Sequence, residues 1–154
     1  MFFKKKKIKD VMNRNVKVCV RESTVRDAAY LMKQYNCASI PIVESKDTYR
    51  PVGCISEREV VQRVVARGMD PKVRLVSEFM QTPCPTVFEN ETLDSAYRKM
   101  EEQHYEKLFV TDWKGRVSGV LGKNEISEHL SDGRFARLMK SVLIPTVSHG
   151  QEAA

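Results

Sequence analysis

The stretch Ile8-Lys9-Asp10-Val11-Met12 recurs 68 residues later as Val76-Ser77-Glu78-Phe79-Met80. Both stretches read apolar, polar, acidic, apolar, methionine, and the same register continues through many of the residues that follow. Self-similarity at a fixed spacing is the signature of a repeated structural unit. The sequence of 154 residues therefore predicts two copies of one unit in tandem.

An amphipathic helix follows the opening stretch in each copy. Apolar side chains recur at i, i+3, i+4 and i+7 over residues 25–32 and again over residues 93–100, the pattern of a helix with one buried face. Thr24 and Thr92 stand directly ahead of these stripes, where threonine caps a helix N-terminus. Asp27, three residues after the first cap, predicts a capping box.

Two strands and a second helix complete each copy. Runs of strand-forming residues at 38–43 and 108–111 are each followed by a loop and another strand, and the first loop is two residues longer. The register therefore slips from 68 to 66, and the matched pairs become Arg50 with Arg116, Gly53 with Gly119, and Glu59 with Glu125. Each copy reads short helix, strand, helix, strand, strand, helix.

The copies define the expected organisation of the chain. We expect a basic tail at residues 1–7, repeats at 8–68 and 76–131, a linker at 69–75, and a C-terminal helix and tail at 132–154. A unit of about sixty residues is too small to bury both faces of a sheet. The two copies should therefore pack together as one pseudo-twofold domain of the α/β (α+β) class.

The net charge of +6 is concentrated at one end of the chain. Lys4, Lys5, Lys6, Lys7 and Lys9 supply five of the 26 positive charges, which leaves the remainder nearly neutral. A nucleic-acid surface needs basic residues gathered on a folded face, so we do not expect a nucleic-acid partner. The sequence also shows no run of apolar residues of membrane-spanning length and no signal-peptide pattern, so we expect a cytoplasmic protein without a membrane span.

The residues that most often carry metal or catalytic chemistry show no productive spacing. Cys19, Cys37, Cys54 and Cys84 contain no C-x-x-C pair, and free cysteines in apolar segments act as small hydrophobes. The three histidines have no ligand spacing, and neither a G-x-S-x-G motif nor a complete phosphate loop is present. We expect no metal site, no catalytic residue and no enzymatic activity.

Taken together, the two copies resemble the CBS-domain pair, also called a Bateman module. The resemblance covers residues 8–131 and is carried by the doubled opening, the threonine-capped helix, and the stretches 39–43 and 53–60. It implies a βαββα fold for each repeat and adenosine-containing ligands, such as AMP, ADP, ATP or S-adenosylmethionine, in clefts between the repeats. It also implies a regulatory role with no required cofactor, a homodimer formed through the helices, and output through an effector protein.

In the first repeat we expect a phosphate at the turn from the second strand into the last helix. Ser56 stands at the helix N-terminus, where free N–H groups and the positive end of the helix dipole favour an anion, and Arg58 adds charge. Glu59 and Glu125 stand where the resemblance implies an aspartate that binds ribose hydroxyls. In the alternative interpretation, Ser56 and Glu59 form only a capping box.

The second turn lacks the hydroxyl because Gly122 replaces it. Lys107 and Lys123 supply cations there, although both also fit a solvated surface, so we expect the first turn to contribute most. The resemblance implies that the segment ahead of each repeat's first strand completes the opposite cleft. The full set of expected nucleotide contacts is Ser39, Ile40, Pro41, Gly53, Ser56, Arg58, Glu59, Pro83, Cys84, Pro85, Asn15, Val16, Lys17, Lys107, Leu108, Gly119, Lys123 and Glu125. Gly122 and the two glutamates favour the alternative function, a nucleotide-free dimerisation or interaction module that binds protein or nucleic acid.

Overall fold

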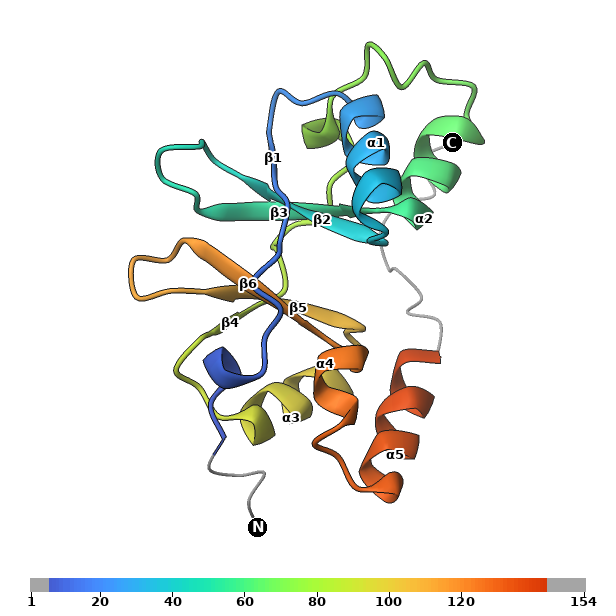
Figure 1. The fold of residues 1–154 in the computed structure, drawn as a ribbon. Helices are drawn as coiled ribbons and strands as arrows, with labels where there is room; N and C mark the ends of the chain where they lie inside the picture. Colours follow the sequence, from blue (N-terminus) through green and yellow to red (C-terminus); the bar gives the residue numbers. More distant parts are fainter. Residues whose placement is uncertain (1–5, 144–154) are drawn as a thin grey trace.

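Two similar units stack on one another in the computed structural model, which describes residues 6–143 (Figure 1). The first unit consists of η2 (Ile8–Asp10), β1 (Cys19–Val20), α1 (Val25–Tyr35), β2 (Ser39–Val43), β3 (Pro51–Ser56), α2 (Glu57–Glu59) and η3 (Val60–Val65). The second consists of η4 (Val76–Glu78), β4 (Thr86–Phe88), α3 (Leu93–Gln103), β5 (Lys107–Thr111), β6 (Val117–Gly122) and α4 (Lys123–Ser127), and α5 (Asp132–Leu143) follows it. The expectation of two tandem βαββα repeats is confirmed.

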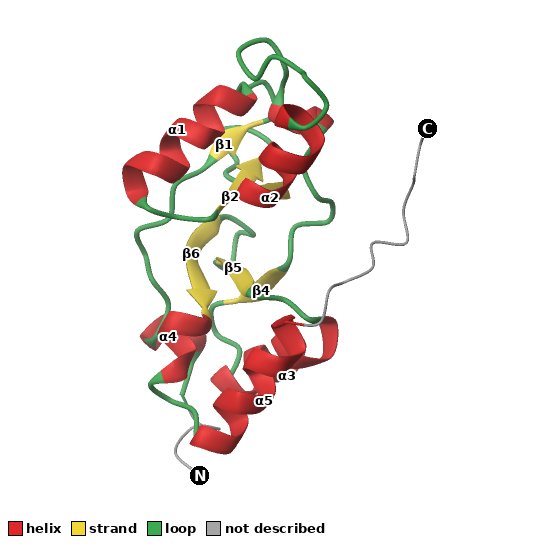
Figure 2. Cartoon of the chain, turned by 90° about the vertical axis from the view of Figure 1, so that its right-hand side faces the viewer, coloured by secondary structure: helices red, strands yellow, loops and turns green. Residues whose placement is uncertain are grey.

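Each repeat carries a three-stranded sheet, ordered β1-β2-β3 in the first and β4-β5-β6 in the second. In both sheets the first two strands are parallel, the last two form an antiparallel hairpin, and the hairpin register shifts at the equivalent place. The sheets occupy the middle of the molecule, with the helices of the first repeat at one end and those of the second at the other (Figures 1 and 2). This layering gives each repeat its own core between sheet and helices.

The predicted helix caps are present. In α1 the backbone N–H of Asp27 donates to Thr24 Oγ1 over 3.1 Å, and the N–H of Thr24 donates to Asp27 Oδ2 over 3.1 Å. In α3 the N–H of Ser95 donates to Thr92 Oγ1 over 3.2 Å. Threonine at these positions therefore sets where both helices begin, because it satisfies N–H groups that have no partner within the helix.

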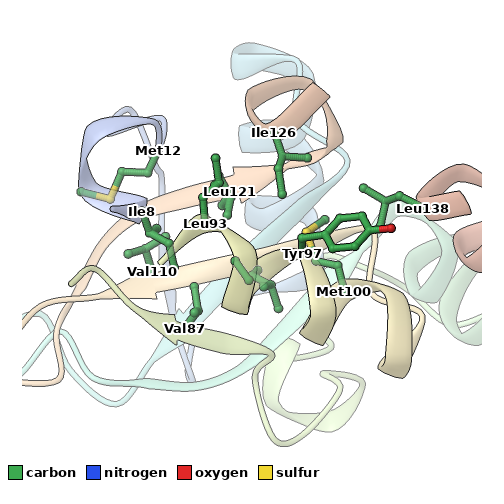
Figure 3. Packing of buried hydrophobic residues seen from close by; sticks show 12 residues of the cluster. Ile8, Met12, Val87, Leu93, Tyr97, Met100, Val110, Leu121, Ile126 and Leu138 are labelled. Atoms are coloured by element: carbon green, nitrogen blue, oxygen red, sulfur yellow. The ribbon is translucent and has the colours of Figure 1, made fainter. Parts of the chain in front are cut away.

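The opening stretch of each repeat packs in the core of the other repeat. Ile8 and Met12, from η2 and the residues after it, join the buried cluster around Leu93 in the second repeat (Figure 3). Val76 and Phe79 join the buried cluster of the first repeat. The backbone N–H of Leu93 also donates to the carbonyl of Lys6 over 2.8 Å, so the end of the basic tail belongs to the fold. Lys4 and Lys5 lie outside the described residues.

Two glycines allow the exchanged stretches to approach the sheets closely. A Cβ atom at Gly53 would lie 2.8 Å from both Met80 Sδ and the carbonyl oxygen of Gln81. At Gly119 it would lie 2.8 Å from Met12 Sδ and 2.9 Å from the carbonyl oxygen of Asn13. The match of these two glycines across the repeats thus has a packing cause, since a larger residue would push the crossing chain off its strand.

The C-terminal helix α5 packs on α3 (Figure 2). Leu138 is fully buried in the second core, Arg134 pairs with Asp94 over 2.9 Å, and the carbonyl of Ser141 lies 2.8 Å from His104 Nδ1. Phe135 remains 38% exposed. The helix is therefore anchored to the second repeat. Within residues 6–143, no corresponding helix packs on α1 of the first repeat.

The close approach at the paired glycines leads to a stability prediction. Gly53→Ala and Gly119→Ala should each lower the free energy of unfolding by about 1–3 kcal/mol, because the added methyl group overlaps a backbone carbonyl as well as a methionine. Gly133→Ala in α5 is the matched control, since its added methyl group has no atom within 4 Å apart from its chain neighbours and the backbone of its own helix. Urea unfolding of the three variants checks this, and equal midpoints for all three would contradict it.

Candidate functional site

The first turn, from β3 into α2, is built as a capping box. The backbone N–H of Ser56 donates to Glu59 Oε2 over 2.7 Å, the Ser56 hydroxyl also donates to that oxygen, and the N–H of Glu59 lies 3.4 Å from Ser56 Oγ. The alternative interpretation of this pair is therefore realised in the structure. Glu59 points back to its own helix end, so any ribose role must be compatible with this contact.

The second turn, from β6 into α4, repeats half of that box. The backbone N–H of Gly122 donates to Glu125 Oε2 over 2.8 Å, and no hydroxyl is present. Lys107 lies opposite Gly122 in the β5–β6 pairing, and its Cε would be 3.8 Å from a Cβ atom at Gly122. The lysine stem thus lies over the turn where the first repeat has a serine hydroxyl.

The hairpin registers bring the predicted polar residues of each turn together. Ser39 pairs with Ser56 across β2 and β3, and the N–H of Glu57 donates to the carbonyl of Ala38 over 2.9 Å. The start of β2 is thereby tied to the start of the last helix in the first repeat. Both serines are partly buried at the same end of one sheet, whereas Arg58 is exposed.

The segments ahead of the first strands cross to the opposite repeat. Cys54 and Gln81 exchange two backbone hydrogen bonds, of 3.0 and 2.7 Å, and Asn13 and Val120 exchange two of 2.9 Å. Cys84 consequently packs against Cys54 and Phe109 in a small buried cluster, with Val16 and Val120 against its edge. This cluster, which we call the seam, joins the two repeats.

The remaining expected contacts differ widely in exposure. Lys17 places its ammonium 4.5 Å from the centre of the Tyr35 ring, beside the end of α1. Ile40 and Leu108 are fully buried in the core of their own repeats, so their side chains support the sheets. Of the expected set, the exposed members are Asn15, Arg58, Pro83 and Lys123; the partly buried are Val16, Lys17, Ser39, Ser56, Glu59, Pro85, Lys107 and Glu125; the buried are Ile40, Pro41, Gly53, Cys84, Leu108 and Gly119.

Cys37 is a residue near this region that the sequence reasoning did not select. Burial raises the pKa of its thiol, the charge of Lys107 acts in the opposite direction, and Glu57 adds to the rise. Lys107 of the second repeat therefore lies within electrostatic reach of the first repeat. The sequence held a signal for Cys37, because this residue lies two positions before the expected contact Ser39. Its counterpart Tyr105 lies two positions before the expected contact Lys107.

Within residues 6–143, no group of three or more cysteine, histidine, aspartate or glutamate side chains could hold a metal ion. None of the helices in that part of the chain combines the length and the apolar character that crossing a bilayer requires.

Comparison with known proteins agrees with this architecture. A family model described as CBS domain matches residues 8–66 and 76–132. The uncharacterized protein MK0525 of Methanopyrus kandleri is 29% identical over 117 residues, which cover 76% of this chain and 59% of that protein. The CBS domain-containing protein YhcV of Bacillus subtilis is 31% identical over 124 residues, covering 78% of this chain and 86% of YhcV. The chain thus spans less than two thirds of the MK0525 sequence.

Solved structures share the fold. The CBS domain protein TA0289 of Thermoplasma acidophilum has a TM-score of 0.75 at 25% identity, over 88% of this chain and 75% of that one. CBSX2 in complex with AMP has a TM-score of 0.67 at 20% identity, over 80% and 95%. The domain pair of MJ0100, in complex with 5'-methylthioadenosine and S-adenosylmethionine, has a TM-score of 0.69 at 22% identity, over 80% and 94%. At these last two identities the likeness concerns the fold alone.

Because the second turn contains only half of the capping box, we predict that Glu125 alone caps the start of α4. Glu125→Ala should lower the free energy of unfolding by about 0.5–2 kcal/mol, because the N–H of Gly122 loses its acceptor. Glu128→Ala, which removes an exposed carboxylate one position beyond α4, should change it by less than about 0.5 kcal/mol. Thermal and urea unfolding measure both, and an equal loss in the two variants would argue against the cap.

Proposed function

The chain belongs to the CBS domain family as a tandem pair, and we propose that it is a regulatory module that binds an adenosine-containing ligand between its repeats. The observation that carries the proposal is the crossing of the chain ahead of each first strand. It brings Cys84 and its flanking prolines to β3, the strand that ends at Ser56. A ligand held there would contact both repeats, which is the condition for a ligand to change how they are arranged.

The two turns offer different chemistry to a phosphate. At the first turn, the Ser56 hydroxyl and Arg58 favour an anion. The carboxylate of Glu59 accepts the hydrogen bond of the Ser56 N–H and brings a negative charge to the same turn. At the second turn, Lys107 and Lys123 are cationic and Glu125 holds the N–H of Gly122. We assign the main contact to the first turn through Ser56, with Lys107 as the cation of the second turn.

Relatives with this fold support the class of ligand. CBSX2 is described with AMP, and the MJ0100 pair with 5'-methylthioadenosine and S-adenosylmethionine. An adenosine group is common to all three ligands, whereas the phosphate is not. The ligand of this chain should therefore carry an adenosyl group, and the binding experiment identifies its 5' substituent.

The binding test uses calorimetry and thermal shift with AMP, ATP, 5'-methylthioadenosine and S-adenosylmethionine. A ligand at about 100 times its dissociation constant adds roughly 2.7 kcal/mol of stability, so the melting temperature should rise by several degrees. Ser56→Ala should weaken binding of the nucleotides about fivefold or more through the loss of one hydrogen bond. The variant also loses a helix cap, so affinities are compared at temperatures where it is folded.

The second turn has a matched pair of lysines for its control. Lys107→Ala tests the cation over Gly122, and Lys114→Ala removes an exposed lysine in the β5–β6 loop, at the other end of the hairpin. If nucleotide binding survives Ser56→Ala and is lost only in Lys107→Ala, the ligand binds at the second turn instead. If none of the four ligands binds at millimolar concentration, the proposal is wrong.

A nucleotide-free interaction module is the second candidate function. The observation that favours it is that Glu59 and Glu125 both point back to cap their own helices. Each carboxylate is thus already bonded within its own turn rather than directed at a ribose. In that case the repeats would serve to bind a second copy or a partner protein.

We further propose that the regulatory unit is a homodimer formed through the last helix of the first repeat. Val61 and Val65 lie one helical turn apart and are 57% and 59% exposed. Exposed apolar side chains on one helix face favour burial against a partner, and α5 packs on the second repeat, away from this helix.

The dimer is tested by light scattering, which should give about twice the 17.7 kDa mass of one chain. The double variant Val61→Lys/Val65→Lys should shift the protein to the monomer, because two charges would be buried in the contact. Val73→Lys is the control, since Val73 is 68% exposed outside the helices. A monomer mass for the unmodified chain at high concentration contradicts the dimer.

A further inference from the structure

Cys54 and Cys84 meet in the seam although they are 30 positions apart in the chain. Cys54 is a central residue of β3, and its backbone is fixed to the crossing segment by the two hydrogen bonds with Gln81. Cys84 follows three residues later in that segment. The two residues are 6% and 8% exposed and share Phe109 as a neighbour.

The two thiols interact with one another. A hydrogen bond between the side chains of Cys54 and Cys84, together with burial, raises the pKa of the Cys84 thiol. Both cysteines are free thiols in the structure. Their common place in the buried seam cluster puts the two side chains next to each other.

We propose that Cys54 and Cys84 are an oxidisable dithiol, a modification site at which a disulfide joins the first repeat to the crossing segment of the second. The oxidant is a small-molecule disulfide such as oxidised glutathione. The thiolate of one cysteine attacks it, one glutathione thiol leaves, and a mixed disulfide forms on the protein. The second thiolate then attacks the protein sulfur and releases the other glutathione. The two protein thiols lose two electrons and two protons, and the oxidant becomes two thiols.

Access to the pair depends on the crossing segment. Gln81, Thr82 and Pro83, which lie directly ahead of Cys84, are all exposed, so a short local opening of this segment uncovers the thiol without unfolding either core. Buried thiols with little thiolate react slowly. The reaction should therefore accelerate with rising pH, and the pair should respond to sustained rather than brief oxidation.

The other two cysteines provide internal comparisons. Cys19 is buried in the first core, away from the seam, and Cys37 is partly buried at the end of α1. Cys37 reports that the oxidant has reached the protein, because it forms a mixed disulfide without needing a protein partner. A disulfide between Cys54 and Cys84 closes a loop of 30 residues and so restricts the unfolded chain.

The experiment incubates the full chain with oxidised glutathione at pH 7 and at pH 8.5, blocks free thiols, and maps tryptic peptides by mass spectrometry without reduction. The expected product links peptide 47–58, which contains Cys54, to peptide 75–98, which contains Cys84. It should form faster at the higher pH, disappear on reduction, and raise the melting temperature by about 5 °C or more. Cys37→Ser should keep the link and the shift, and Cys84→Ser should lose both.

The proposal is overturned if Cys37 is completely converted to its mixed disulfide while peptides 47–58 and 75–98 stay unlinked. It is also overturned if the link joins two chains, which mixing of isotope-labelled and unlabelled protein detects. Peptide mapping of the unmodified sequence decides the question even if Cys84→Ser does not fold.

Discussion

The exchange of opening stretches between the repeats is the contact on which the rest of the structure depends. Ile8 and Met12 complete the core of the second repeat, and Val76 and Phe79 complete the core of the first. A repeat of about sixty residues buries only about 60% of the surface of its unfolded chain and is marginally stable alone. Because each core contains side chains from the other repeat's opening, the repeats fold as one unit, and the crossing chain must pass between the sheets.

That passage determines the chemistry of the region between the repeats. The crossing backbone bonds to β3 at Cys54 and to β6 at Val120, and the glycines at 53 and 119 leave the space that Met80 and Met12 occupy. The same segments then place Cys84 and Val16 in the seam. Residues that would serve a ligand and residues that hold the repeats together are thus neighbours on the same strands, so a ligand at the turns and a disulfide in the seam would act on the same contact.

The two repeats share a fold but differ in the residues of their turns and in the exposure of their helices. The first has the complete capping box at Ser56 and an uncovered helix with Val61 and Val65 at its surface. The second has Gly122 with Lys107 over it, and α5 packed on α3 through Leu138 and Arg134. The two ends of the molecule therefore differ: exposed valines lie on the first repeat, and α5 covers part of the second.

Local features of this protein follow from the sequence alone, and contacts between distant residues do not. The doubled opening, the threonine caps and the order of strands and helices are each determined within a few residues, because capping, amphipathic periodicity and strand propensity act over that range. The sequence also located the turns at Ser56 and Gly122. The Ser56–Glu59 spacing also left open the capping box that the structure contains. Only the tertiary structure decided that Leu138 anchors α5, that the charge of Lys107 acts on Cys37, and that Cys54 packs with Cys84. Each of these depends on which side chains meet once the cores have formed, and spacing along the chain does not specify such a meeting.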